Sequence, residues 1–304
     1  MHGDGTVTWR QLWAGATTQL GDRGEARWIC EEASGTSGAE WLDVLDQPAG
    51  AHAVTDLDAM IARRMKGEPI QYVLGHWPFR HLDLFVDRRV LIPRPETEIV
   101  AGAAIEIARS FVPLDDDDVG NEDGNEVTVV VDLGTGSGAI GLAVAEELPL
   151  EGTAVWLTDA SPDAIDVARA NLAGIGRSAA NVRIAEGSWF DALTEHRDLL
   201  RHGVHVVVSN PPYVELEDPR LAASVLDWEP GAALFAGADG LDAIRIIIGE
   251  ARDWLVPGGA LVLEIGCDQG ARCSALARDA GFVDVEVRQD AAGLDRILVA
   301  RNSH

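Results

Sequence analysis

The stretch SNPPYV at residues 209–214 directly follows a run of apolar residues. Pro211 and Pro212 have no backbone N–H group and a fixed φ, so they cannot continue the hydrogen-bond ladder of a sheet. One interpretation is a rigid turn that closes a strand. The other is that the stiff backbone holds acceptor oxygens and an aromatic face in fixed positions.

Gly134, Gly136 and Gly138 lie between a predicted strand and a predicted helix, in the segment VVDLGTGSGAIGLAVA at 130–145. Glycine lets a ligand approach the backbone closely and adopts φ values that other residues avoid. The helix that follows presents free N–H groups at its start. Together with Gly141, the last two of these glycines fit a G-x-G-x-x-G pattern. The loop therefore indicates a site for a nucleotide-like cofactor.

Asp159 ends the next predicted strand, 21 positions beyond Gly138. At that position an acidic side chain can accept hydrogen bonds from both hydroxyl groups of a ribose. The alternative role is to accept from the start of the helix that follows, although Ser161 and Pro162 already suit that helix start. Trp189, in the segment GSWF, follows the third predicted strand. It could pack on a flat heterocycle or simply be buried.

The glycine loop, Asp159, Trp189 and the turn at 209–214 each follow a predicted strand at its carboxyl end. In open α/β sheets, ligands bind at that edge. Four turns that coincide there favour a binding site over the interpretation of residues 209–214 as a rigid turn alone.

Other catalytic chemistries find no matching motif in the sequence. A P-loop requires Gly-Lys-Ser/Thr, but the only lysine, Lys66, lies between Met65 and Gly67. Neither a G-x-S-x-G nor an H-E-x-x-H segment occurs. The three cysteines, at 30, 267 and 273, are scattered and form no C-x-x-C pair, which argues against a disulfide framework and a zinc site. We expect no bound metal.

The composition of the 304-residue chain limits its class. Hydrophobic residues make up 47%, which permits a sizeable core. The net charge is −26, from 50 acidic and 24 basic residues, and such a field repels phosphate backbones, so direct nucleic-acid binding is not expected. The N-terminus has no signal-peptide pattern, and no apolar run is long enough to span a membrane. We therefore expect a cytoplasmic protein without membrane association.

After residue 126 the sequence alternates between strand and helix patterns. Strands are predicted at 127–132, 154–158, 182–185, 204–208, 260–265, 283–288 and 296–300. Helices are predicted near 139–148, 162–173, 241–255 and 269–280. Unbroken Val/Ile/Leu strands that alternate with helices predict a parallel sheet covered on both faces, and the last two strands add an antiparallel edge. The predicted class is α/β, with a seven-stranded, mostly parallel, Rossmann-like sheet.

Residues 1–67 are predicted to form a small all-helical domain. Apolar residues recur along one face of a helix in two places: Trp9, Leu12, Trp13, Ala16 and Leu20, and again Leu57, Met60, Ile61 and Met65. The segment SGAE at 37–40 predicts a capping box. We expect all four tryptophans of this region to pack in its core.

Three segments connect the helical region to the predicted sheet. Residues 70–92 alternate in places, which predicts a hairpin or short strands. The segment PRPETE at 93–98 precedes the predicted helix IVAGAAIEIARSF. Residues 115–126 are acidic and nearly free of apolar groups, which predicts a solvated loop.

The motifs DLGTGSG, NPPY, GEPIQYVLG and LIPRPETE together resemble the HemK/PrmC family. Members of this family are S-adenosylmethionine-dependent methyltransferases that modify a glutamine side-chain amide in peptide-chain release factors. NPPY alone is shared with amino-methylating DNA enzymes, whereas NPPY with IPRPETE is more specific to the protein-glutamine group. The resemblance covers nearly the whole chain. It implies a helical substrate-recognition domain at 1–69, a β-hairpin linker at 70–92 and a class I methyltransferase domain at 93–304.

The resemblance also implies roles for individual residues. The cofactor S-adenosylmethionine would be bound by Gly134, Thr135, Gly136, Ser137, Gly138, Asp159, Ser188, Trp189 and Asn210. The target amide would be bound, and its methylation catalysed, by Asn210, Pro211, Pro212 and Tyr213, and Arg94 and Thr97 would help to shape the pocket. Ser188 departs from many relatives, which carry an acidic residue before the Trp-Phe pair.

The implied substrate class leaves alternatives open. The expected partner is a release factor with a Gly-Gly-Gln motif, and the protein is expected to act as a monomer. A sister enzyme that methylates a glutamine of a ribosomal protein would carry the same motif. An adenine-N6 nucleic-acid methyltransferase would use the same chemistry on another planar NH2 group, and a catalytically silent cofactor-binding protein is a third alternative.

Overall fold

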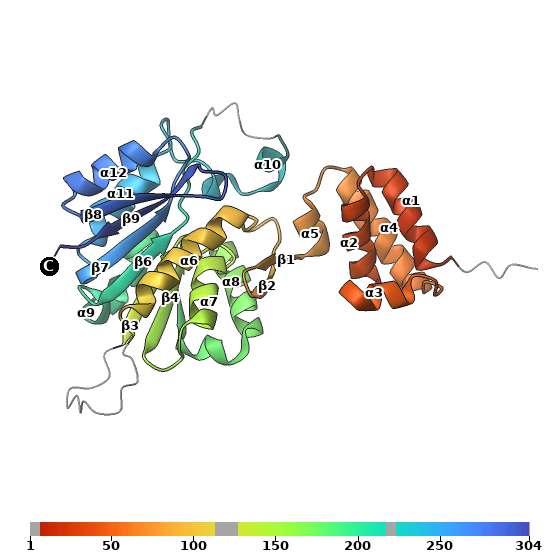
Figure 1. The fold of residues 1–304 in the computed structure, drawn as a ribbon, viewed down its shortest axis with the longest axis horizontal. Helices are drawn as coiled ribbons and strands as arrows, with labels where there is room; N and C mark the ends of the chain where they lie inside the picture. The colour runs from red at the N-terminus through yellow and green to blue at the C-terminus, as the bar shows by residue number, and fades with distance from the viewer. Residues whose placement is uncertain (1–6, 113–126, 217–222, 304) are drawn as a thin grey trace, which may run out of the picture. The chain divides into compact units, whose positions relative to one another are not determined.

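The computed structural model describes residues 7–112, 127–216 and 223–303 (Figure 1). The predicted solvated loop at 115–126 lies outside them. The described residues fall into two compact units, one within 1–77 and 222–228 and the other within 78–221 and 229–304.

The first unit is helical. Its helices are α1 (Trp9–Leu20), α2 (Arg23–Ser34), α3 (Gly38–Val44), α4 (Ala51–Met65), α5 (Ile70–Leu74) and α10 (Ala223–Trp228). The two predicted apolar faces are largely confirmed, because Trp9 and Ala16 of α1 and Leu57 and Ile61 of α4 are buried. Trp41 is fully buried, and its ring meets the edge of Trp9 at a centroid distance of 5.9 Å. Aromatic packing thus supplies much of this small core.

The predicted capping box at 37–40 is wrong. Ser37 precedes α3 but makes no side-chain capping hydrogen bond. The first residue of that helix, Gly38, has a φ of +58°, which takes the backbone out of the geometry that a capping box requires. The structure instead has a capping box at the start of α1, between Thr8 and Gln11.

Two apolar predictions and one strand prediction also fail. Met65 and Trp28 are 61% and 44% exposed, and Trp28 packs edge-on against Trp77 rather than in the core. Residues 70–74 form helix α5 instead of extended structure, and Gly75 ends this helix in the left-handed conformation. The predicted hairpin is confirmed only after it, as β1 (His76–Phe79) and β2 (Leu82–Phe85).

The second unit is built on a seven-stranded sheet of order β5-β4-β3-β6-β7-β9-β8 (Figure 1). Its strands are β3 (Thr128–Leu133), β4 (Thr153–Asp159), β5 (Val182–Glu186), β6 (Val204–Ser209), β7 (Leu255–Glu264), β8 (Val283–Gln289) and β9 (Asp295–Arg301). The pairs from β5 to β7 are parallel, and β9 is antiparallel to both of its neighbours. The predicted α/β class with a mostly parallel sheet is confirmed.

Helices cover this sheet. They are α6 (Pro95–Arg109), α7 (Ala139–Glu147), α8 (Pro162–Gly174), α9 (Arg197–Leu200), α11 (Asp242–Ala251) and α12 (Gly270–Asp279), with 3-10 turns at Gly176–Asn181, Trp189–His196 and Gly231–Ala233. Helix α6 begins at Pro95, earlier than predicted, because proline suits the first helical position. Helix α11 ends at Ala251 rather than near residue 255, because β7 already begins at Leu255.

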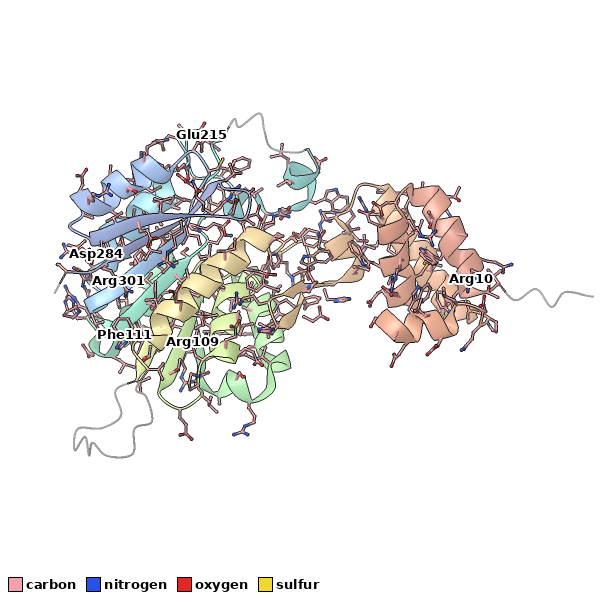
Figure 2. All side chains as sticks on the ribbon, in the orientation of Figure 1. Arg10, Arg109, Phe111, Glu215, Asp284 and Arg301 are labelled. Carbon is pink, nitrogen blue, oxygen red and sulfur yellow. The ribbon has the colours of Figure 1, made fainter. Side chains whose placement is uncertain are left out.

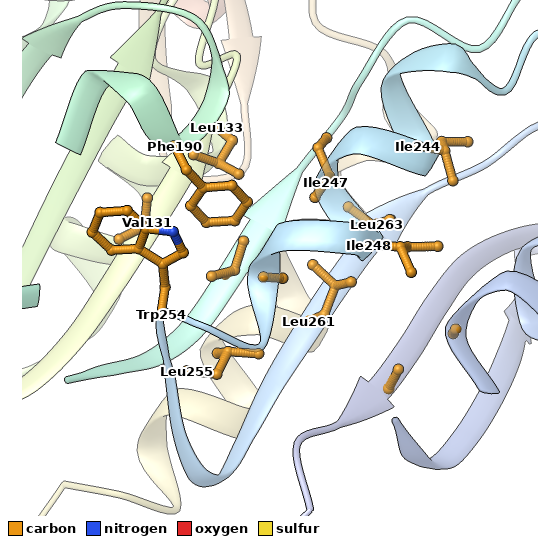
Figure 3. Close-up of a cluster of buried hydrophobic side chains, with 14 of the residues drawn as sticks. Val131, Leu133, Phe190, Ile244, Ile247, Ile248, Trp254, Leu255, Leu261 and Leu263 are labelled. Atoms are coloured by element: carbon orange, nitrogen blue, oxygen red, sulfur yellow. The ribbon is translucent and has the colours of Figure 1, made fainter. Parts of the chain in front are cut away.

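Alternate residues of β3 face different layers. Val131 and Leu133 pack with Leu261 and Leu263 of β7 and with isoleucines of α11 in one buried cluster (Figure 3). Asp132, between them, instead accepts a hydrogen bond from the backbone of α7. Both faces of the strand are therefore buried, as its unbroken apolar sequence predicts.

Charged side chains cover the outside of both units (Figure 2). Arg10 of the helical unit pairs with Asp46 at 2.6 Å, and Arg109 of the other unit lies 3.9 Å from Glu147. Arg10, Asp46 and Arg109 are exposed, and exposed pairs of this kind contribute little stability. These two surface pairs therefore contribute little to the folding free energy.

We expect Gly141→Ala to lower the free energy of unfolding by about 1–3 kcal/mol. A Cβ atom at this position of α7 would lie 2.0 Å from Leu157 Cδ2, and because Leu157 is fully buried, its side chain or the helix must move into a filled core. Gly249→Ala is the matched control, because that glycine is also helical, is exposed and has open space around it. The control is expected to gain up to about 1 kcal/mol from helix propensity. Urea denaturation measures both values, and equal stability of the two variants would contradict close packing at Gly141.

Candidate active site

A cavity of about 360 Å³ opens at the carboxyl ends of β3, β4, β5 and β6. Most of the predicted site residues line it: Thr97, Gly134, Thr135, Gly136, Ser137, Asp159, Ser188, Trp189, Asn210 and Pro212. The structure places four others next to these residues in the chain but outside the lining: Arg94, Gly138, Pro211 and Tyr213. The four turns that the sequence analysis selected thus meet at one cavity.

The glycine loop forms the floor of the cavity beside β4. Gly134 and Gly136 adopt left-handed φ values of 68° and 56°, which other residues rarely do. Asp159 accepts a hydrogen bond from the Gly136 backbone N–H at 2.9 Å and another from the Ser161 N–H, also at 2.9 Å. Its carboxylate therefore supports both the loop and the start of α8, so the alternative structural role also holds. Asp159 also lines the cavity, and each of its oxygens keeps acceptor capacity beyond these bonds.

Trp189 lies over the glycine loop. A Cβ atom built on Gly134 would be 3.4 Å from the Trp189 ring, which is an ordinary contact, so the left-handed φ of 68° rather than lack of space favours glycine here. Trp189 itself has a φ of +46°, an uncommon conformation for an aromatic residue. The ring is only partly buried and lines the cavity. Burial alone does not explain it, and its face is available to a flat ring.

Asn210 is held by a chain of hydrogen bonds. Its Nδ2 group donates to Thr97 Oγ1 at 3.1 Å, and Thr97 Oγ1 donates to Glu264 Oε2 at 2.7 Å. Because Nδ2 is used in this way, the Asn210 Oδ1 atom remains as the acceptor at the cavity wall. Tyr213 Oη donates to the other oxygen of Glu264 at 3.0 Å. One carboxylate therefore holds both ends of the NPPY turn.

Glu264 was missed by the sequence analysis. It is 1% exposed, and burial raises the pKa of its carboxyl group above the ordinary value. The sequence carries a signal for it, since a single charged residue ends the otherwise apolar strand ALVLE. Such a residue at the carboxyl edge of a parallel sheet is a candidate site residue by the same rule that selected Asp159.

Arg94 forms an ion pair with Glu229, whose side chain is 2% exposed. Glu229 also accepts a hydrogen bond from the Ile92 backbone N–H at 3.1 Å. The residues beside these partners, Pro93 and Pro230, line the cavity. The predicted pocket-shaping role of Arg94 is thus indirect in this geometry, because its guanidinium group joins two wall segments. Glu229 gave no signal in the sequence.

Asp132 lies beneath the glycine loop. Its Oδ2 atom accepts from Thr135 Oγ1 at 2.6 Å and from the Gly141 N–H at 2.9 Å, while Oδ1 has no hydrogen-bond partner among the described residues. Burial, together with the nearby Asp159 charge, raises the pKa of Asp132 to about 7. The loop is therefore coupled to a buried group that takes up a proton near neutral pH.

The described residues contain neither a metal-binding cluster nor a membrane-spanning helix. No group of three or more His, Cys, Asp or Glu side chains there could hold a metal ion. In the same part of the chain, no helix is long and apolar enough to cross a membrane.

Comparison with known proteins supplies the family. Residues 12–75 match the family described as PrmC N-terminal domain, and residues 121–226 match the Methyltransferase small domain. The release factor glutamine methyltransferase of Burkholderia pseudomallei is 40% identical over 90% of this chain and 89% of its own length. The enzyme of the same name from Coxiella burnetii is 41% identical over 81% of this chain and 79% of its own length. This chain belongs to the release factor glutamine methyltransferase family.

Membership of this family confirms the predicted resemblance to HemK/PrmC proteins. The chain is therefore a methyltransferase, and S-adenosylmethionine is its methyl donor. The cavity fits this cofactor, because the Asp159 carboxylate, the Trp189 indole and the left-handed glycine loop all line it. Among solved structures, the delta-N METTL16 MTase domain is 16% identical, covers 83% of this chain and 96% of its own, and has a TM-score of 0.49.

We expect Asp132→Asn to flatten the dependence of stability on pH. With a pKa of about 7 in the folded state and an ordinary value of 3.8 when unfolded, the folded protein binds more protons, so its stability falls as pH rises through this window. Between pH 5 and pH 8 the wild type is expected to lose about 3 kcal/mol from this group, and the variant none of it.

Urea denaturation at both pH values measures the difference. Asp198→Asn is the control, because an exposed carboxylate keeps its hydration on folding. Identical pH profiles for the wild type and Asp132→Asn would show that Asp132 is ionised in the folded protein throughout this range.

Proposed function

We propose that this protein transfers a methyl group from S-adenosylmethionine to the side-chain amide nitrogen of a glutamine in a peptide-chain release factor. The observation that carries this proposal is the orientation of Asn210. Its Nδ2 group is engaged by Thr97, so its Oδ1 atom is left as an acceptor at a cavity that also contains the glycine loop and Asp159. An acceptor for NH2 therefore lies in the same cavity as the features of a nucleoside site.

The amide nitrogen of glutamine is a poor nucleophile because its lone pair is delocalised into the carbonyl group. In the proposed complex, Asn210 Oδ1 and the Pro211 carbonyl accept the two amide hydrogens. These acceptors stabilise the positive charge that the nitrogen gains as the new N–C bond forms. The sulfonium group of the donor would supply the methyl carbon: its S–C bond would break as the N–C bond forms, and the neutral thioether would leave. The nitrogen then loses one proton to solvent, so no strong general base is required.

Tyr213 was predicted to cover the planar amide with its ring, and Pro212 to stiffen the turn. The Tyr213 hydroxyl donates to Glu264, which supports a role in holding the turn. Pro212 lines the cavity, so it is close enough to contact the substrate. We propose that Asn210 and Pro211 bind the amide through their oxygens, while Pro212 and Tyr213 limit its position.

The cofactor is proposed to lie against the glycine loop. Asp159 accepts the ribose hydroxyls, and Ser188 and Trp189 lie beside the adenine. Their support is their place in the cavity lining, and for Trp189 also the position of its ring beside Gly134. Gly138 is proposed to act through the start of α7, where its N–H and φ of 88° shape the loop.

The partner is proposed to be a release factor, as the names of the curated relatives indicate. We further propose that the enzyme acts as a monomer and does not bind nucleic acid. The net charge of −26 supports the second point, because a nucleic-acid substrate would be repelled. The predicted cytoplasmic location stays a prediction.

The decisive experiment incubates the protein with labelled S-adenosylmethionine and a purified release factor, and locates the label by mass spectrometry. The expected result is one methyl group on the glutamine of the Gly-Gly-Gln motif. A release factor with asparagine in place of that glutamine is the control. Label on ribosomal protein after nuclease treatment, or on DNA or RNA instead, would replace the proposed substrate with one of the two alternatives.

Asn210→Ala and Asp159→Ala are expected to separate chemistry from cofactor binding. Loss of the Asn210 acceptor should lower kcat by roughly 10²–10³ and leave the cofactor Kd unchanged. Loss of the Asp159 carboxylate should weaken cofactor binding by roughly 10–100-fold, because it removes hydrogen bonds to a charged group. Calorimetry measures the affinity and label transfer measures kcat. Wild-type turnover by Asn210→Ala would remove Asn210 from the mechanism.

A further inference from the structure

We infer that Glu264 is a positioning residue for methyl transfer, which sets the direction of the hydrogen bonds that orient the Asn210 amide. The inference deepens the proposed function and rests on it. Glu264 does not line the cavity, so it acts through Thr97 and Tyr213 rather than on the substrate.

The direction of these hydrogen bonds follows from the charge state. An ionised carboxylate only accepts hydrogen bonds, so Thr97 and Tyr213 must both donate to it. Thr97 has a single hydroxyl proton, and it points to Glu264. The hydroxyl oxygen can then only accept from Asn210, which turns Asn210 Nδ2 towards Thr97 and leaves Oδ1 for the substrate. The orientation of a flippable amide is thus specified by a group two hydrogen bonds away.

A neutral side chain at position 264 would not specify the orientation of the Asn210 amide. A glutamine side chain has one acceptor oxygen and one NH2 group, so one of the two hydroxyls would face a donor. Thr97 could then donate to Asn210 Oδ1 and occupy the oxygen that the substrate amide requires. Ionisation of Glu264, rather than the shape of its side chain, is what the geometry uses.

A charge on the Glu264 side chain is unfavourable for the stability of the fold. Glu264 is 1% exposed, and within the described part of the chain its carboxylate forms no ion pair. Two charged groups lie near Glu264: Glu96 of α6 disfavours its ionisation, and Arg296 of β9 favours it. Tyr213 faces Glu264 from the turn after β6. A buried carboxylate without a paired cation costs folding free energy that a neutral side chain of the same shape would not. Its presence therefore points to a functional requirement.

The test compares Glu264→Gln with the wild type in the release-factor assay. The expected result is a kcat lower by 10-fold or more, an unchanged cofactor Kd, and a stability in urea equal to or above that of the wild type. Glu147→Gln is the matched control, since it makes the same change at a largely buried carboxylate paired with Arg80 and distant from the cavity. That control should lose stability and keep its kcat.

Two further readouts separate positioning from a structural role. Thr97→Val should lower kcat by as much as Glu264→Gln does. The double variant should lose little more kcat than either single variant, because both act through the same hydrogen bond. Thr97→Ser keeps the hydroxyl and should therefore have a higher kcat than Thr97→Val. Because burial raises the pKa of Glu264, wild-type kcat should fall as pH is lowered towards that raised value, and this limb should be absent in Glu264→Gln.

The outcomes distinguish the inference from the proposed function. If the wild type transfers no methyl group to the release factor, both fall. If the wild type is active and Glu264→Gln keeps its kcat and its acidic limb, only the role of Glu264 is overturned. A kcat loss in Glu264→Gln that matches a loss of folded protein would overturn it equally, because a structural role would suffice.

Discussion

The carboxylate of Glu264 accepts hydrogen bonds from Thr97 and Tyr213, and these bonds join segments that are far apart in the sequence. Thr97 lies in the first turn of α6, 167 positions before Glu264 at the end of β7. Tyr213 belongs to the turn after β6. Thr97 and Tyr213 are each positioned by their own part of the chain, but the buried Glu264 carboxylate fixes these parts relative to one another. The orientation of the Asn210 side chain depends on that connection.

The parallel sheet makes such a connection possible. Because β3, β6 and β7 are adjacent and parallel, their carboxyl ends meet at one edge. Ser209 Oγ at the end of β6 donates to the Leu133 carbonyl at the end of β3 at 2.6 Å. This hydrogen bond therefore connects the strand ends from which the NPPY turn and the glycine loop begin, so the position of one determines the position of the other. In the proposed complex, a cofactor on the loop and an amide at the turn would therefore lie close together.

Periodicity and turn chemistry predicted the sheet, its helices and the four turns that line the cavity. These features depend on local sequence: apolar runs for buried strands, and Gly or Pro where the backbone must turn. The failures have a different cause. Helix α5 is a five-residue segment whose conformation follows from tertiary packing. Glu229 is the partner of Arg94 across 135 positions, and no local pattern specifies such a pair. Glu264 does leave a local signal, as the single charge that ends an apolar strand, but its pairing with Thr97 does not.

The two prolines belong to a turn that hydrogen bonds also hold at its other end, at Tyr213. The Tyr213 carbonyl accepts from Gln269 Nε2 at 3.0 Å, and the Tyr213 hydroxyl donates to Glu264. Proline removes backbone freedom in the unfolded chain as well, so little remains to be ordered when a substrate binds. A weak nucleophile gains most from acceptors that are already in place, because reorganisation at the moment of reaction would add to the barrier. In the proposed mechanism, the stiffness of this turn is therefore part of the chemistry and does more than end a strand.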